Sequence, residues 1–73
     1  MSEVAVIGEP ARVSGFALAG MLVFPADSPQ EVRHAWDELT TSVGVVFLTA
    51  QAAAALGTRM HAQGAPLSVV MPS

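Results

Sequence analysis

Four short apolar runs punctuate the chain, and each ends at a glycine, a proline or a threonine. The runs cover residues 4–7, 21–24, 43–49 and 67–71. The first run is continuously apolar rather than alternating, which is typical of a parallel strand buried on both faces, and the run at 43–49 is rich in β-branched residues. We therefore predict four strands, and we expect the short run at 21–24 to form an edge of the sheet.

The stretch between the second and third runs carries the clearest helix signal. Ser28 is a favoured N-cap residue, Pro29 suits the first helical position, and Glu31 completes a capping box. Apolar residues then recur at helical spacing, at Val32, Ala35, Trp36 and Leu39. We predict an amphipathic helix here, with Trp36 packed in the core rather than exposed as a binding hot spot.

The polar side of this helix offers two pairs at i, i+4 spacing, Arg33 with Asp37 and His34 with Glu38. Pairs at this spacing stabilise a helix. The two histidines, His34 and His61, have neither metal-ligand spacing nor a neighbouring nucleophile. We therefore assign them no chemistry.

Two further helices are predicted, over residues 12–21 and about 50–62. In the first, one face carries Val13, Phe16, Ala17 and Gly20. Gly15 and Gly20 weaken this helix by up to about 1 kcal/mol each relative to alanine, so we expect both to approach the sheet closely. In the second, Gly57 is a weak point or an early stop.

The order of elements is strand, helix, strand, helix, strand, helix, strand. Such alternation with short connections predicts an α/β fold with right-handed crossovers. We expect a small Rossmann-like or flavodoxin-like three-layer domain, residues 1–73, with three helices. Its four-stranded parallel sheet is most simply ordered 2-1-3-4.

The composition excludes several kinds of catalytic and binding site. The chain has 73 residues, a net charge of −3, three scattered arginines and no lysine. A Walker-type lysine and Schiff-base chemistry are therefore excluded, and no basic footprint for nucleic acid exists. No cysteine is present, and no apolar stretch reaches the 18 or so residues of a membrane span. We expect a cytoplasmic, soluble protein without metal or cofactor.

A glycine lies between the first predicted strand and the first predicted helix, as it does in many nucleotide-binding loops. A dinucleotide fingerprint needs G-x-G-x-x-G directly after the strand, but Gly15 is the next glycine after Gly8. Pro10 also removes an amide donor. A phospho-receiver domain needs a lysine and an aspartate after the third strand, where Thr49 stands instead. We interpret Gly8 as a turn residue.

Four polar residues follow the carboxyl ends of the predicted strands, where open α/β sheets bind ligands: Glu9, Asp27, Thr49 and Gln51. Glu9 and Asp27 could act as general acid and base. We favour a structural interpretation, in which Asp27 begins a turn, Thr49 caps a helix and Glu9 is solvated.

The segment IGEPARVSGFALAGM, residues 7–21, resembles the family of F subunits of V-type and A-type rotary ATPases. Glu9 stands where that family more usually has aspartate. Residues 31–53 are similar to the family's helix, third strand and following helix, and residues 66–73, PLSVVMPS, are similar to its fourth strand. The ordered set covers nearly the whole chain. Family members typically continue into a further C-terminal helix, so this sequence, ending at Ser73, resembles either a short form or a family member truncated before that helix.

The resemblance implies a non-catalytic subunit of the central stalk, with no nucleotide site. Such a subunit rotates with the D subunit, near the catalytic hexamer, and couples ATP turnover to ion transport. It is peripheral to the membrane, on the cytoplasmic side. The candidate partner contacts are Glu9, Pro10, Asp27, Thr49, Gln51, Val69 and Met71.

Two further hypotheses follow from the sequence. The chain could instead be a stand-alone regulatory or ligand-binding α/β domain of receiver-like topology. In the strand order 2-1-3-4, moreover, residues 67–71 form an edge without any charge. Apolar edges with free N–H and C=O groups recruit other strands, so at high concentration we expect a homodimer through this edge, or a larger assembly.

Overall fold

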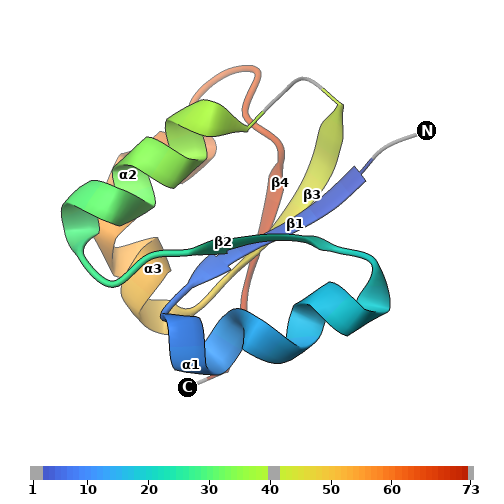
Figure 1. Cartoon of the computed structure of the whole chain (residues 1–73). Coiled ribbons are helices and arrows are strands. Elements are labelled where there is room, and N and C mark those ends of the chain that lie inside the picture. The colour runs from blue at the N-terminus through green and yellow to red at the C-terminus, as the bar shows by residue number, and fades with distance from the viewer. Residues whose placement is uncertain (1–2, 40–41, 73) are drawn as a thin grey trace.

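The chain folds around one four-stranded sheet. The structure, a computed structural model, describes residues 3–39 and 42–72. Its strands are β1 (Glu3–Gly8), β2 (Leu22–Pro25), β3 (Val43–Leu48) and β4 (Leu67–Val70). All neighbours are parallel, and the order across the sheet is β2-β1-β3-β4 (Figure 1). The predicted α/β fold class, strand order and edge strands are confirmed.

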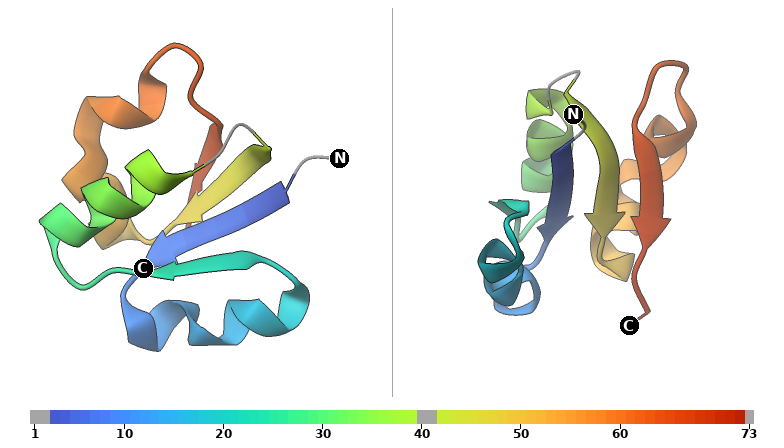
Figure 2. Two further views of the ribbon diagram at one scale, coloured as in Figure 1. Left: turned by 45° about the horizontal axis from the view of Figure 1, so that its top comes forward. Right: turned by 90° about the vertical axis from the view of Figure 1, so that its right-hand side faces the viewer.

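Helices cover the two faces of the sheet unequally. α2 (Pro29–Glu38) and α3 (Ala50–Leu56) contact each other and pack on one face. α1 (Pro10–Val13) and the 3₁₀ helix η1 (Ser14–Ala19) lie against the β2 side of the other face. The right-hand view of Figure 2 shows β3 and β4 with no helix in front of them. Among the described residues, this second face is therefore covered by helices at its β2 side alone.

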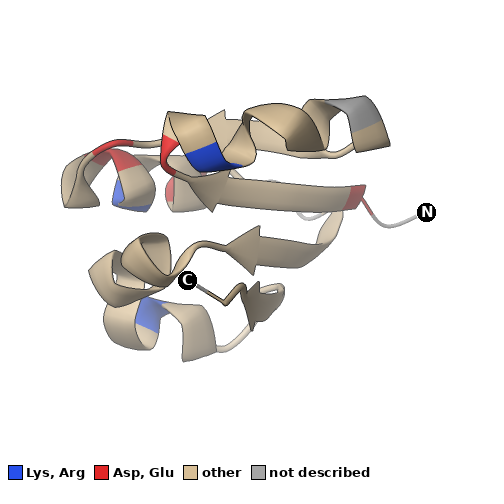
Figure 3. Ribbon diagram, turned by 90° about the horizontal axis from the view of Figure 1, so that it is seen from below, with Lys and Arg blue, Asp and Glu red and all other residues tan. Residues whose placement is uncertain are grey.

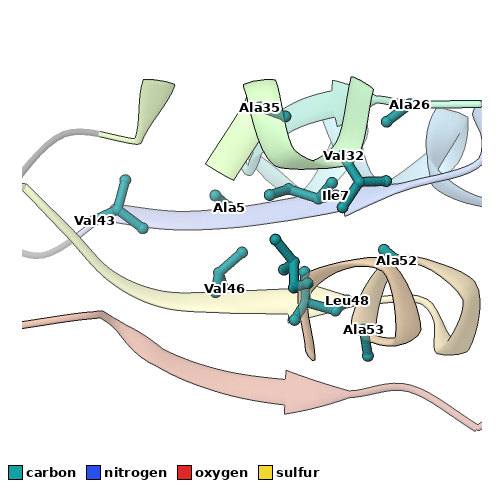
Figure 4. Packing of buried hydrophobic residues seen from close by; sticks show 11 residues of the cluster. Ala5, Ile7, Ala26, Val32, Ala35, Val43, Val46, Leu48, Ala52 and Ala53 are labelled. Carbon is teal, nitrogen blue, oxygen red and sulfur yellow. The ribbon is translucent and has the colours of Figure 1, made fainter. Parts of the chain in front are cut away.

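The main hydrophobic core lies between the sheet and the α2–α3 pair (Figure 4). Its buried members are Ala5, Ile7, Ala26, Val32, Ala35, Val43, Val46, Leu48, Ala52, Ala53 and Leu56. Many of them are alanine or valine, and such small side chains let helices lie close to a sheet. Trp36 packs against this cluster but stays partly exposed, so it lies at the margin of the core.

The first helix differs from its prediction. An α-helix is expected over residues 12–21, but the chain makes the short helix α1 and then tightens into η1. Gly15 lies within η1, where its low helix propensity disfavours a continued α-helix. Gly20 ends η1 with a φ of 81°. A Cβ atom on Gly15 or Gly20 would meet nothing within 4 Å, so the expectation that these glycines approach the sheet is wrong.

α3 also ends before the predicted residue 62. Gly57 has a φ of 56°, in the left-handed region that favours glycine. There the α-helix gives way to the 3₁₀ helix η2 (Gly57–His61). The alternative of an early stop at Gly57 is thus confirmed.

The capping of α2 follows the prediction with one change of partner. The N–H of Glu31 donates to Ser28 Oγ over 3.1 Å, as expected. The Glu31 carboxylate in turn accepts a 2.7 Å hydrogen bond from the N–H of Asp27, one residue before the N-cap. Both bonds fix the turn between β2 and α2.

One of the two predicted i, i+4 pairs of α2 forms and the other does not. His34 Nε2 lies 4.0 Å from Glu38 Oε1. Asp37, however, pairs with Arg59 of η2, with 3.6 Å between Oδ1 and Nη1. The prediction that Arg33 pairs with Asp37 is wrong, because η2 places the guanidinium of Arg59 beside this carboxylate.

Candidate functional site

The carboxyl ends of β1 and β3 meet where an α/β sheet commonly binds ligands. Gly8 ends β1, and Thr49 follows β3. A Cβ atom on Gly8 would lie 2.8 Å from Thr49 Oγ1 and closer still to its methyl group. Gly8 is therefore required here because the Thr49 side chain occupies the space that any larger residue would need. No sequence pattern points to this contact.

Thr49 is 2% exposed and has all of its polar groups bonded. Its backbone N–H donates to the Ile7 carbonyl over 3.2 Å, which ties it to β1. Its hydroxyl donates to Glu9 Oε1 over 2.5 Å and accepts a 3.2 Å bond from the N–H of Ala52. The prediction that Thr49 caps a helix is confirmed, and the same hydroxyl also positions Glu9.

Glu9 is held rather than freely solvated. Besides the Thr49 bond, its Oε2 lies 3.6 Å from Nε of Arg12, one helical turn further on. The Thr49 hydroxyl lowers the pKa of Glu9 most, and its own backbone N–H and Arg12 add to this against an opposing effect of burial. The Glu9 carboxylate is thus hydrogen-bonded as well as solvated, since 23% of its side chain stays exposed. A carboxylate stabilised in its charged form is a poor proton donor near neutral pH.

Asp27 and Gln51 stand at the rim of the same edge, and both are exposed. With Glu9 they line a cavity of about 20 Å³, whose floor includes Val32 and Ala52. This volume suits about one water molecule. Pockets for small ligands and cofactors measure roughly 300–1,000 Å³, so no nucleotide fits this cavity. Asp27 begins the turn into α2, as expected.

The remaining candidate contacts lie apart from this cavity. Pro10 is exposed at the start of α1. Met71 follows β4, and its N–H donates to the Leu48 carbonyl over 2.8 Å. Val69 lies within β4 and is 40% exposed. The structure thus brings Glu9, Thr49, Asp27 and Gln51 together and places Val69 at the sheet edge.

A larger groove, of about 730 Å³, runs between β2 and α2. Its lining includes Phe24 together with the charged or titratable residues Glu31, Arg33, His34, Asp37, Glu38 and Arg59. Figure 3 shows charge of both signs on and around α2, whereas β3 and β4 carry none. Sequence reasoning missed this groove, since residues from three separate segments form it. The i, i+4 charges of α2 were its one sequence signal.

Comparison with known proteins identifies the family. The sequence profile of the ATP synthase (F/14-kDa) subunit matches residues 4–73. The chain belongs to this family. A search of curated proteins found no match. The part of this ATP synthase F-family chain that the structure describes has no helix long and apolar enough to cross a membrane.

A solved structure agrees with this assignment at the level of fold. The F-family chain is similar to the F subunit of the V-type ATP synthase from Archaeoglobus fulgidus, known from a crystal structure. The two share 23% sequence identity, and the match covers 93% of this chain and 96% of the other, with a TM-score of 0.69. The four-stranded sheet with its helices is therefore a fold that the F subunit of a V-type ATP synthase also has.

Proposed function

We propose that this chain is a non-catalytic subunit of the central stalk of a V-type or A-type rotary ATPase. There it binds the D subunit, lies beside the catalytic hexamer, and couples ATP turnover to ion transport. The observation that carries the proposal is the family match over residues 4–73. The chain would be peripheral to the membrane, on its cytoplasmic side.

The geometry of the carboxyl edge supports a binding role rather than catalysis. Thr49 and Glu9 satisfy each other there, and the cavity beside them holds about 20 Å³. These contacts give a rigid surface around the edge instead of a substrate pocket. Glu9, Pro10, Asp27 and Gln51 would present this surface to the stalk, and Val69 and Met71 would extend it toward β4.

Binding to the D subunit encoded in the same genome tests the proposal directly. The two purified proteins are mixed and measured by size-exclusion chromatography with light scattering and by isothermal titration calorimetry. We expect a one-to-one complex of micromolar or tighter affinity. The paired variants Asp27→Arg and Gln51→Arg should weaken it at least tenfold, because they place charge on the proposed contact surface.

The matched control is Gln63→Arg, a likewise exposed glutamine that precedes the start of β4, at the opposite end of the sheet. It should leave the affinity unchanged. If the D subunit does not bind at all, the stalk assignment is wrong and a stand-alone regulatory domain is favoured. If it binds and Asp27→Arg has no effect, the stalk role holds and the contact surface is misplaced.

A further inference from the structure

The two edges of the sheet, β2 and β4, differ in what their backbone offers to a neighbour. Directly after β4, the N–H of Met71 donates to the Leu48 carbonyl, so Met71 and, two residues earlier, Val69 direct their backbone groups toward β3. Successive residues of a strand face opposite sides. Ser68 and Val70 therefore direct both N–H and C=O away from the sheet, on the side where the described residues form no further strand.

The edge at β2 offers fewer outward backbone donors within the strand. The N–H of Ala26 donates to the Gly8 carbonyl, so the outward positions of β2 are Val23 and Pro25. Pro25 has no N–H to donate, and proline is a usual means of blunting an edge strand. η1 also packs against β2. A strand from another molecule would thus find half of the donors missing.

The side chains of β4 add nothing that discourages pairing. Residues 67–71 contain no charge. Leu67 is 67% exposed and Val70 50% exposed. Val45 pairs with Leu67 and Phe47 with Val69, so these four apolar side chains share one face of the sheet. At β3 and β4, no described helix lies over this face (Figure 2).

We propose that a second copy of this chain pairs with β4 in antiparallel fashion, about a twofold axis that passes between the two Val69 residues. Ser68 of each copy exchanges both backbone hydrogen bonds with Val70 of the other. Val69 then faces its own counterpart at the non-hydrogen-bonded position, and Leu67 faces Met71. The two sheets join into one of eight strands, with an apolar stripe continuous across the axis.

The size of this contact sets its strength. Stable interfaces bury about 800 Å² per partner, which is more than an edge strand of four residues supplies. We therefore expect a weak dimer, with a dissociation constant on the order of 0.1–1 mM. This inference does not rest on the stalk role, since it concerns the isolated chain before assembly.

Sedimentation and NMR on the isolated 73-residue chain test the dimer. Between about 10 μM and 2 mM, the weight-average mass should rise toward that of two chains. Over the same range the amide signals of Ser68 and Val70 should shift and gain protection from exchange, while that of Val23 stays constant. A mass that stays monomeric at 2 mM, or shifts that concentrate at Val23, would overturn the proposal.

Two variants distinguish pairing in this register from non-specific association. Val69→Lys sets two lysines face to face at the axis and should raise the dissociation constant at least tenfold. Its matched control is Leu22→Lys on β2, which should change nothing. Ser68→Pro removes an outward N–H without touching the ladder to β3, so it should keep the native circular dichroism and lose the dimer. Undiminished association of a folded Ser68→Pro chain would refute the register.

Discussion

The hydroxyl of Thr49 donates a 2.5 Å hydrogen bond to the carboxylate of Glu9, across 40 residues of sequence. This single contact joins the end of β1 to the start of α3. The same hydroxyl accepts from the N–H of Ala52, so strand, turn and helix share one oxygen atom. The carboxyl edge of the sheet is thereby organised by structural bonds between its own residues.

Replacing Thr49 by valine should lower the free energy of unfolding by about 1–2 kcal/mol, the usual cost of losing an N-cap side chain. Valine keeps the shape of threonine, so the loss comes from the two hydrogen bonds rather than from a cavity. Urea unfolding measures it. The control is Thr58→Val in exposed η2, and equal effects of the two substitutions would contradict this role of Thr49.

Stability should depend on pH through Glu9. Its pKa is lowered from an ordinary value near 4.5, chiefly by the Thr49 hydroxyl. A carboxylate with a depressed folded pKa contributes stability above its unfolded pKa, and this contribution is lost as the pH falls through the folded value. Unfolding measured from pH 7 to pH 3 should show the parent losing more stability than Glu9→Gln.

The same hydrogen bond makes a spectroscopic prediction. In Thr49→Val, the pKa of Glu9 followed by the NMR signal of its side-chain carboxyl carbon should rise toward the ordinary value, since its main stabilising donor is gone. Thr58→Val should leave it where it is in the parent. A titration of Glu9 that is identical in Thr49→Val and the parent would show that the hydroxyl does not hold the carboxylate.

Substitution by alanine should change the stability in opposite directions at two glycines of this chain. Gly8→Ala drives a methyl group into Thr49 and should cost roughly 1–3 kcal/mol, as overpacking does. Gly15→Ala meets open space and should be neutral or stabilising, by up to about 1 kcal/mol. Thermal melts of both variants decide the point, and a harmless Gly8→Ala would mean that the β1 end and Thr49 are not in close contact.

The purified chain should bind neither ATP nor NAD. The cavity at the carboxyl edge is about 20 Å³, Pro10 contributes no amide donor, and the short helix α1 replaces the long phosphate-binding helix of dinucleotide folds. Calorimetric titration should give no heat above dilution up to millimolar nucleotide. Micromolar binding that Gly8→Ala abolishes would contradict this account of the edge.

Much of the fold could be predicted because its signals are local. Each apolar run marks a strand, and the cap at Ser28 marks the start of α2. The end of α3 at Gly57 can likewise be predicted from the sequence, because it depends on the positive φ of this one glycine. The family resemblance in residues 7–21 rests on the same kind of local pattern.

The interior of the candidate site could not be predicted, because it depends on contacts between distant segments. Nothing near Glu9 in sequence indicates that Thr49 will hold it, and nothing near Asp37 indicates Arg59 as its partner. The glycines show the same limit. Sequence identifies Gly8 and Gly15 as permissive positions, but only the packed sheet shows that Gly8 alone of the two faces a neighbour.

The central claim, a coupling role in the stalk, is tested most directly in membrane vesicles that carry the rotary ATPase of the same organism. ATP hydrolysis and ion uptake are measured together, first with the gene for this chain deleted and then with the purified chain restored. We predict that deletion lowers the ions moved per ATP hydrolysed and that one equivalent of the chain restores the ratio. An unchanged ratio in its absence would contradict the account.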